Sequence, residues 1–202
     1  MNSKKILIVA PSWIGDLIIT QSFLKYLKNL YPDSVIDLVS RKGFISLLKL
    51  MPEIDNIYEI DIKHGKLDLI KRYKFSQVVK ENNYTESFVL TNSFKSALIP
   101  WFANIPTRVG FLGEGRFFLL NKICKQKKEN QIMINKFLDL VNGQYNIDIK
   151  PKLKLDKIKL NSVIKKFFIK NNSKNIILCP DAEYGSAKRW PEKKWVDLSI
   201  DL

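Results

Sequence analysis

Near its start the chain reads Ile6-Leu7-Ile8-Val9-Ala10-Pro11-Ser12-Trp13-Ile14-Gly15-Asp16, and this stretch decides the fold. Its first four residues are all aliphatic, which predicts a strand buried on both faces. After Asp16 the apolar residues change period, because leucines recur at helical spacing from Leu17 to Leu30. The chain therefore runs from a strand through a tight turn into a helix that begins at Gly15-Asp16.

Asp16 is the first candidate for chemistry. In open α/β sheets, ligands bind outside the carboxyl ends of the strands, so Asp16 is expected at the mouth of a crevice. A helix N-terminus favours a charged carboxylate, and we expect Asp16 to be ionised and able to accept a proton from a bound hydroxyl. Aspartate is also a common helix cap without any chemistry, and its position alone favours that simpler interpretation.

Strands and helices alternate through the next hundred residues. Apolar runs predict strands at 34–39, 57–60, 87–90 and 107–111, separated by helices at 43–50, 67–82 and 94–103. Residues 112–130 read as a loop with a buried turn at 117–120, and 131–141 as a helix. This alternation predicts an α/β fold with a doubly wound parallel sheet, whose strand-to-helix loops share one rim.

A second unit is expected after residue 150. Residues 1–150 form the Rossmann-like domain, 151–160 a linker, and 161–202 the start of a second α/β domain. In the latter we expect a helix over 161–170, a buried strand over 175–179 and a helix beginning at Trp195. One strand with two helices cannot close a core, so we expect a truncated domain or a tail that needs a partner.

Composition excludes several classes of protein. The chain has 202 residues, 46% of them hydrophobic, which is enough for a sizeable core. No apolar run approaches the ~18 residues of a membrane span, and Pro11 and Asp16 interrupt what would resemble a signal peptide. Cys124 and Cys179 have no metal or redox spacing, and we expect a cytoplasmic protein.

The net charge of +14 allows two interpretations. It suits a phosphate-bearing ligand or the anionic inner face of a membrane. Scattered lysines, however, form a solvated face just as readily.

Three more loops are expected on the rim that holds Asp16. The first contains His64, which is more often a surface residue than a base. The second, Asn92-Ser93-Phe94-Lys95-Ser96, reads as a helix cap, or as hydroxyl, amide and ammonium groups for a phosphorylated sugar. The third carries Arg108 before Gly110, with Arg116 beyond, and an arginine fork binds phosphate or pairs with an acid.

A last loop is Cys179-Pro180-Asp181-Ala182-Glu183-Tyr184-Gly185-Ser186-Ala187-Lys188-Arg189-Trp190-Pro191. It follows the expected strand and precedes a helix, so it offers free N–H groups to a diphosphate. Lys188 adds a positive charge for a leaving phosphate, and Trp190 reads as core packing.

Three of these motifs together resemble the bacterial heptosyltransferases of glycosyltransferase family nine. They are Ser12-Trp13-Ile14-Gly15-Asp16, the Asn92–Ser96 loop with its following Arg-x-Gly strand, and the loop that ends at Trp190-Pro191. The resemblance covers essentially the whole chain. Asp181 departs from it, because the family usually has glycine there, and this places a negative charge near the expected diphosphate.

The resemblance implies a GT-B architecture and inverting heptose transfer with Asp16 as the base. The amino-terminal domain would hold the lipid A–core acceptor, and the second domain ADP-L-glycero-D-manno-heptose. No metal or other cofactor is implied, and no Asp-x-Asp pair is present to bind Mg²⁺. Acceptor residues would be Ser12, Trp13, Gly15, Asn92, Ser93, Lys95 and Arg108, and donor residues Glu183, Ser186, Lys188 and Arg189.

Two further expectations follow from the resemblance. The family's later acidic residue and its histidine-containing donor loop would lie beyond Leu202, so we expect little or no transfer by these 202 residues alone. The protein would also touch the anionic inner membrane surface, and no nucleic-acid partner is expected.

Rival interpretations are weaker. An NAD-dependent enzyme would need Gly-x-Gly-x-x-Gly after the first strand, where only Gly15 is present, and a P-loop is absent. A basic nucleic-acid-binding module fits the charge but lacks a recognisable motif. A non-catalytic protein that keeps acceptor binding stays open.

Overall fold

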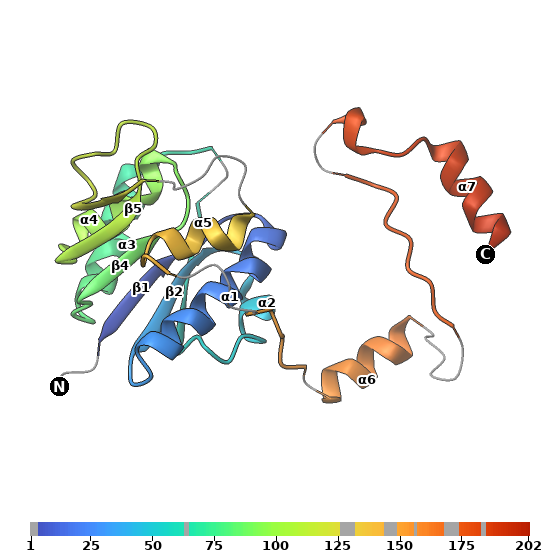
Figure 1. The fold of residues 1–202 in the computed structure, drawn as a ribbon, viewed down its shortest axis with the longest axis horizontal. Helices are drawn as coiled ribbons and strands as arrows, with labels where there is room; N and C mark the ends of the chain where they lie inside the picture. The colour runs from blue at the N-terminus through green and yellow to red at the C-terminus, as the bar shows by residue number, and fades with distance from the viewer. Residues whose placement is uncertain are drawn as a thin grey trace. The chain divides into compact units, whose positions relative to one another are not determined.

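The computed structural model describes residues 4–62, 65–125, 132–143, 149–155, 157–167, 174–182 and 185–202. Its internal contacts divide the chain into two units, Met1–Leu155 and Asp156–Leu202. All the strands among the described residues belong to the first unit (Figure 1).

Six parallel strands form one sheet in the order β3-β2-β1-β4-β5-β6. Their bounds are β1 (Lys5–Val9), β2 (Val35–Arg41), β3 (Asn56–Ile60), β4 (Glu86–Val89), β5 (Thr107–Phe111) and β6 (Lys122–Cys124). The chain winds outward from β1 to β3 and then returns to the other side of β1 through β4. This confirms the doubly wound parallel sheet that the sequence predicts.

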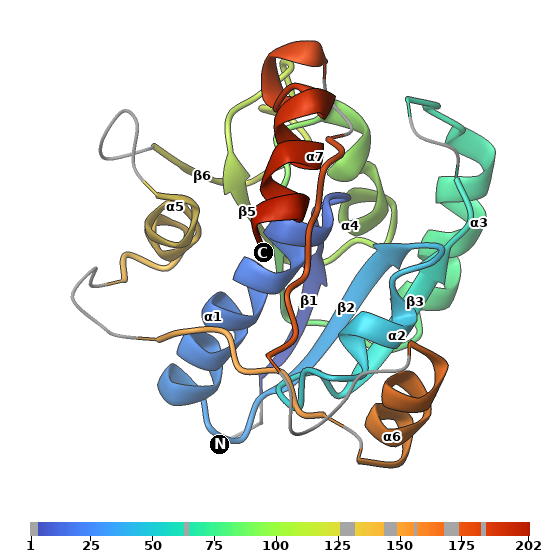
Figure 2. The ribbon, with the colours of Figure 1, turned by 90° about the vertical axis from the view of Figure 1, so that its right-hand side faces the viewer.

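Helices cover both faces of the sheet (Figure 2). On one face α1 (Ile14–Leu30) packs against α5 (Met133–Asp139), and on the other α3 (Leu69–Lys80) packs against α4 (Leu98–Phe102). Alternate residues of β1 serve the two layers: Ile6 and Ile8 belong to the core under α1, whereas Leu7 belongs to the core under α3 and α4. Both faces of β1 are therefore buried, as the aliphatic run predicts. The short helix α2 (Ile45–Leu48) links β2 to β3.

Two local predictions in this unit need correction. Within 112–130, Leu119 and Leu120 are buried as expected, but Phe117 and Phe118 are exposed. The same region also contains β6, which the sequence analysis missed because a three-residue edge strand is too short for an apolar alternation.

The expected helix over 94–103 is divided. It consists of a 3-10 turn, η1 (Phe94–Ser96), followed by α4. Pro100 lies in the first turn of α4, where its missing N–H leaves no helical hydrogen bond unmade. Ser93 has the N-cap position of η1, but its side chain makes no capping hydrogen bond.

The segment just after residue 150 belongs to the first unit. The backbone N–H of Lys152 donates to Oε1 of Gln21, 2.8 Å away, and the Gln21 amide donates to the Lys152 carbonyl at 2.9 Å. The N–H of Lys154 also donates to the Leu50 carbonyl. Because Gln21 is fully buried, these bonds satisfy a side chain that water does not reach.

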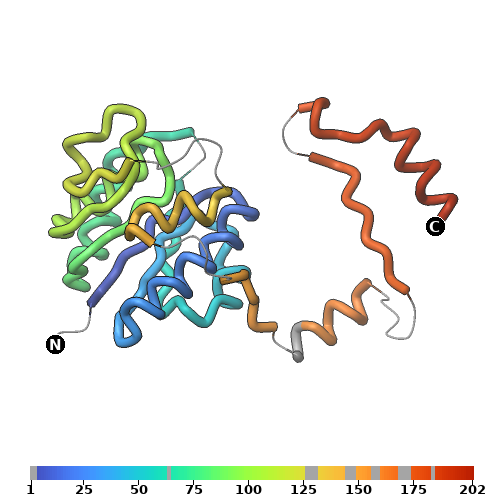
Figure 3. The backbone as a smooth tube through the Cα atoms, viewed as in Figure 1, coloured from blue at the N-terminus to red at the C-terminus, as the bar shows by residue number. Residues whose placement is uncertain are grey.

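The second unit, whose path Figure 3 traces, contains α6 (Lys157–Lys166), the 3-10 turn η2 (Ser186–Lys188) and α7 (Glu192–Asp201). The buried strand predicted over 175–179 is wrong, because this segment is irregular and Ile177 is 84% exposed. A strand needs a neighbour to complete its hydrogen bonds, and the described residues of this unit include no other strand.

The end of the chain also differs from its prediction. Helix α7 begins at Glu192, directly after Pro191, rather than at Trp195. Trp190 is 44% exposed instead of being core packing, and its ring meets Trp195 edge to face with centroids 5.2 Å apart. Among the described helices, none has both the length and the apolarity needed to cross a bilayer.

Candidate functional site

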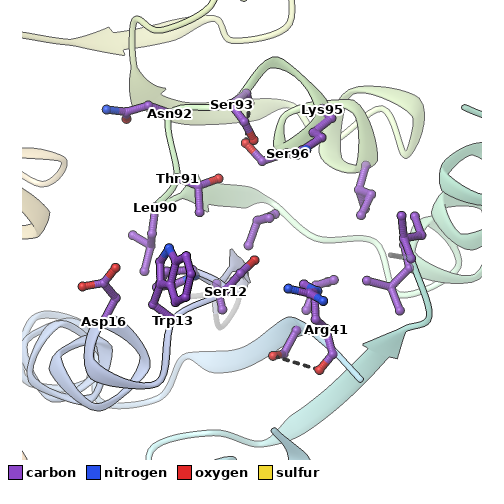
Figure 4. Close-up of a pocket in the computed structure, with 18 of the residues that line it drawn as sticks. Ser12, Trp13, Asp16, Arg41, Leu90, Thr91, Asn92, Ser93, Lys95 and Ser96 are labelled. Carbon is purple, nitrogen blue, oxygen red and sulfur yellow. Dashed lines mark hydrogen bonds between the residues drawn. The ribbon is translucent and has the colours of Figure 1, made fainter. Parts of the chain in front are cut away.

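A cavity of about 400 Å³ lies at the carboxyl ends of β1, β2 and β4. Strands β1 and β4 are neighbours whose following segments leave the sheet toward opposite faces, and such a switch point is where open α/β sheets bind ligands. Figure 4 shows Asp16 and Trp13 after β1, facing Thr91, Asn92 and Ser93 from the loop after β4.

Asp16 is half-buried in the wall of this cavity. It lies in the first turn of α1, but the N-cap position is held by Trp13, and no side-chain cap hydrogen bond is made there. The capping interpretation is therefore not supported. Within the described part of the chain, the only hydrogen bond at Asp16 beyond the regular helix is one from the Thr20 hydroxyl to its backbone carbonyl, which leaves the carboxylate to face the cavity.

Burial raises the pKa of the Asp16 carboxyl above its usual value, while Lys136 of α5 acts in the opposite direction with a smaller effect. From the sequence we expected the helix N-terminus to lower the pKa of Asp16. The direction of this shift is wrong, because desolvation has the larger effect. A carboxylate with a raised pKa is a stronger base, so the correction strengthens Asp16 as an acceptor of a proton.

Of the other residues predicted after β1, two line the cavity and one does not. Ser12 and Trp13 line the cavity, with the indole beside the Asp16 carboxylate (Figure 4). Gly15 is exposed on α1 and is not among the lining residues.

The loop after β4 supplies the facing wall. Asn92, Ser93 and Lys95 all line the cavity, as the sequence predicts for one shared rim. Thr91, which the sequence analysis did not single out as a ligand, lines it too, and its buried Oγ1 has no hydrogen-bond partner among the described residues. A buried hydroxyl in this state is ready to bind a polar group of a ligand.

The segment that follows β5 fixes this loop through hydrogen bonds from Arg116 and to Glu114. Arg116 is fully buried, and its Nη1 donates to the Ser93 carbonyl at 3.1 Å and to the Ser96 hydroxyl at 3.0 Å. Its Nε and Nη2 donate to the Phe111 carbonyl at 3.0 and 2.7 Å. Burial lowers the pKa of Arg116 to about 10, so it stays charged at neutral pH. Glu114 accepts a hydrogen bond from the Phe94 N–H at 2.7 Å and fixes the loop further.

Arg108 was predicted at the site, but it does not line the cavity. Its guanidinium donates to the carbonyls of Leu119 and Ile105, each at 2.7 Å. These bonds connect β5 to the segments around it, so the residue supports the backbone rather than facing a ligand.

Several lining residues escaped the sequence analysis. Besides the predicted Lys95, the cavity is lined by the basic residues Arg41, Lys66, Arg72 and Lys136, whereas Asp16 is the one acidic residue among the described residues that line it. Arg41 ends β2, so the rule about carboxyl ends of strands could have found it. Arg72 and Lys136 reach the cavity from α3 and α5 through tertiary packing, which sequence spacing does not show.

The predicted donor loop belongs to the second unit. Gly185 has a φ of 63° and precedes η2, in which Ser186 and Lys188 are exposed. The Arg189 Nε lies 2.9 Å from Oδ1 of Asp181, and the same oxygen accepts the Ala182 N–H at 2.8 Å. The charge of Asp181, which was expected to oppose a diphosphate, is thus paired with Arg189.

Two predicted residues, His64 and Glu183, lie outside the described residues. Among the residues that are described, no group of three or more His, Cys, Asp or Glu side chains is arranged to hold a metal ion.

Comparisons with known proteins show the family of the chain. The family model of glycosyltransferase family 9 (heptosyltransferase) matches residues 72–202. The chain belongs to this family. It is 34% identical to lipopolysaccharide heptosyltransferase 2 of Escherichia coli, and 35% identical to lipooligosaccharide heptosyltransferase 2 of Haemophilus influenzae, over 98% and 96% of its length.

Among solved structures, E. coli ADP-heptose lps heptosyltransferase II is similar to 98% of the chain with a TM-score of 0.86 and 31% identity. E. coli heptosyltransferase WaaC with ADP-2-deoxy-2-fluoro heptose shares the fold, with a TM-score of 0.66 over 96% of the chain at 16% identity. These likenesses confirm the predicted GT-B-type α/β class. The chain spans about 60% of the length of the curated heptosyltransferase 2 relatives from E. coli and H. influenzae.

Proposed function

We propose that the whole protein transfers a heptose from ADP-L-glycero-D-manno-heptose to a heptose of the lipopolysaccharide inner core. Membership of the family and the names of the relatives support this reaction class. The observation that carries the proposal is the Asp16 carboxylate, half-buried with a raised pKa at the switch point between β1 and β4.

In the proposed step Asp16 removes the proton from an acceptor hydroxyl. The freed oxygen forms a bond to the anomeric carbon of the donor, the bond from that carbon to the diphosphate breaks, and ADP leaves with the electron pair. Attack opposite the leaving group inverts the configuration. The raised pKa suits this role, because a base works best when its pKa approaches the working pH.

The acceptor is proposed to bind in the cavity of the first unit. Ser12, Asn92 and Ser93 offer hydroxyl and amide groups to sugar hydroxyls, and Trp13 offers a flat apolar face beside Asp16. The charged side chains that line the cavity are basic except for Asp16, which favours an acceptor that carries phosphate or carboxylate groups. Arg108 is proposed to act indirectly by holding the backbone, and Gly15 by keeping the start of α1 free of a side chain.

The donor is proposed to bind through Glu183, Ser186, Lys188 and Arg189. Lys188 would stabilise the charge that develops on the departing diphosphate, and Arg189 would contribute to the loop that holds it. Asp181 does not repel the donor in this proposal, because Arg189 compensates its charge.

The test uses the complete gene product, ADP-heptose and heptosyl-Kdo2-lipid A, with release of ADP and the mass of the acceptor as readouts. We expect the acceptor to gain one heptose for each ADP released. An acceptor without heptose and a different nucleotide sugar serve as controls. Equal transfer to the heptose-free acceptor, or no transfer from ADP-heptose, would overturn the proposed reaction.

A further inference from the structure

The hydroxyl of Thr91 differs from the other polar groups in the cavity wall. Its Oγ1 is buried and has no hydrogen-bond partner among the described residues, although the residue lines the cavity. Asn92, the next residue, is exposed, so water satisfies its amide group. A ligand that binds Asn92 exchanges one hydrogen bond for another, whereas a ligand that binds Thr91 supplies a bond that the described residues do not make. A hydrogen bond to Thr91 therefore adds more to binding.

The sheet and the loop behind it fix the position of Thr91. The N–H of Leu90 donates to the Val9 carbonyl at 3.1 Å, which extends the pairing of β1 with β4 up to the residue before Thr91. Two residues after Thr91, the Ser93 carbonyl accepts the hydrogen bond from Arg116 at 3.1 Å. The Cβ branch of threonine also restricts its rotamers. The hydroxyl is thus held firmly, as a group that discriminates between positions of a ligand must be.

Thr91 lies on the wall opposite the proposed base. Asp16 and Trp13 follow β1, Thr91 follows β4, and all three line the same cavity. Figure 4 shows Thr91 above the Trp13 indole, with the Asp16 carboxylate on one side of that indole. A sugar ring against the indole is therefore within a wall that offers a carboxylate from the β1 side and a hydroxyl from the β4 side.

A general base alone does not select one hydroxyl of a sugar. A heptose carries several hydroxyls of similar acidity, and the one that reacts is the one that the site places in line with the anomeric carbon of the donor. A second fixed hydrogen bond, made to another hydroxyl of the same ring, removes the freedom of that ring to turn on the flat face of Trp13.

From these observations we infer that the Thr91 hydroxyl selects which hydroxyl of the acceptor heptose reaches Asp16, and thereby sets the position of the new glycosidic bond. Thr91 binds a second hydroxyl of the same sugar, while Asp16 still takes the proton and the bond changes are those of the proposed transfer. This role rests on the proposed function, and it makes Thr91 a specificity-determining residue for the acceptor.

The experiment compares the complete gene product with its variants Thr91→Val and Thr91→Ser, using ADP-heptose and heptosyl-Kdo2-lipid A. Valine keeps the shape of threonine but lacks the hydroxyl, and serine keeps the hydroxyl. Nuclear magnetic resonance of the products identifies the linkage. We expect one linkage from the wild type and from Thr91→Ser, but a mixture of linkages from Thr91→Val, with kcat/KM lowered about tenfold by the loss of one hydrogen bond to the acceptor.

A second measurement needs no substrate. Because the buried Oγ1 of Thr91 has no partner among the described residues, Thr91→Val should unfold at a urea midpoint equal to or above that of the wild type. Thr85→Val is the matched control, since the Thr85 hydroxyl donates to the Lys5 carbonyl at 3.0 Å, at the amino end of β4. Its midpoint should fall slightly, while its rate and its single linkage should remain those of the wild type.

Two results would refute this role of Thr91. One is a single, wild-type linkage in the product of Thr91→Val, whatever its rate. The other is a midpoint of Thr91→Val below that of the wild type, because the hydroxyl would then support the fold instead of a ligand. If the wild type forms no heptosylated product, the proposed function fails and this role fails with it, whereas a failure confined to Thr91→Val leaves the proposed function standing.

Discussion

At the scale of single residues, Asp16 combines two properties that oppose each other. Its place in the first turn of α1 favours a carboxylate ion, and its burial favours the neutral acid, which prevails in setting the pKa. A sequence shows that a residue begins a helix, but it does not show how much protein covers the side chain. This is why the role of Asp16 could be predicted and the direction of its pKa could not.

The raised pKa gives a prediction about stability. A folded-state pKa above the unfolded value means that the folded protein prefers the neutral carboxyl, so the charged form lowers stability once the pH exceeds the folded pKa. Asp16→Asn should therefore raise the midpoint of urea unfolding at pH 7. The gain should vanish as the pH falls below the unfolded pKa of about 3.9, where both forms are neutral. A variant less stable than wild type at pH 7 would contradict this reasoning.

Arg116 gives a second prediction. Replacement by Met removes both guanidinium hydrogen bonds to the buried Phe111 carbonyl and those to the Ser93 carbonyl and the Ser96 hydroxyl, and we expect a loss of roughly 2–5 kcal/mol in the free energy of unfolding. Arg116→Lys should recover only part of this loss, because an ammonium cannot reproduce the planar fork. Lys122→Met, at an exposed position of β6, is the control and should change stability by less than about 0.5 kcal/mol.

At the scale of elements, two loops from neighbouring strands depend on close approach. A Cβ on Gly113 would lie 2.5 Å from the Asn92 carbonyl oxygen, whereas nothing lies within 4 Å of a Cβ on Gly15. Gly113→Ala should thus cost about 1–3 kcal/mol by forcing the segment after β5 away from the loop after β4. Gly15→Ala should instead stabilise α1 by up to about 1 kcal/mol. Equal unfolding midpoints for the two variants would refute this difference.

The elements that the sequence predicted well are those with a strong apolar period. The run Ile6–Val9 and the leucines of α1 specify their structures locally, because burial on both faces or on one stripe requires that pattern. The segment 175–179 has an equally apolar run, yet it forms no strand, since a strand exists only with a neighbour. Edge strand β6 has no strong apolar pattern, yet it forms a strand because it pairs with β5. The sequence alone does not show this pairing.

At the scale of the whole molecule, the buried core lies in the first unit. The three core clusters draw all their buried residues from positions 6–140, and none of the residues after 159 whose exposure the structure describes is buried. The candidate site follows the same division, because the Asp16 cavity is built by the sheet, whose strand order brings β1 and β4 together. The position of the site at the carboxyl ends of the strands could be predicted from the topology. The basic residues that α3 and α5 contribute could be identified only in the folded structure.

This division predicts how truncated chains behave. Residues 1–155 alone should unfold cooperatively, with a free energy within about 1 kcal/mol of the whole chain. Residues 1–148 should be less stable, because the buried Gln21 loses both of its hydrogen bonds to Lys152 and keeps only the one from its Nε2 to Oε2 of Glu53. Urea titrations followed by tryptophan fluorescence compare the three chains. A large loss already at residue 155 would show that the second unit supports the core.

The most direct measurement of the central claim is the rate of heptose transfer by the complete gene product carrying Asp16→Asn. If Asp16 is the base, kcat should fall by on the order of 10²–10⁴ while the affinity for the acceptor, measured by calorimetry, stays close to that of the wild type. A variant that binds acceptor and transfers heptose at nearly the wild-type rate would contradict the account.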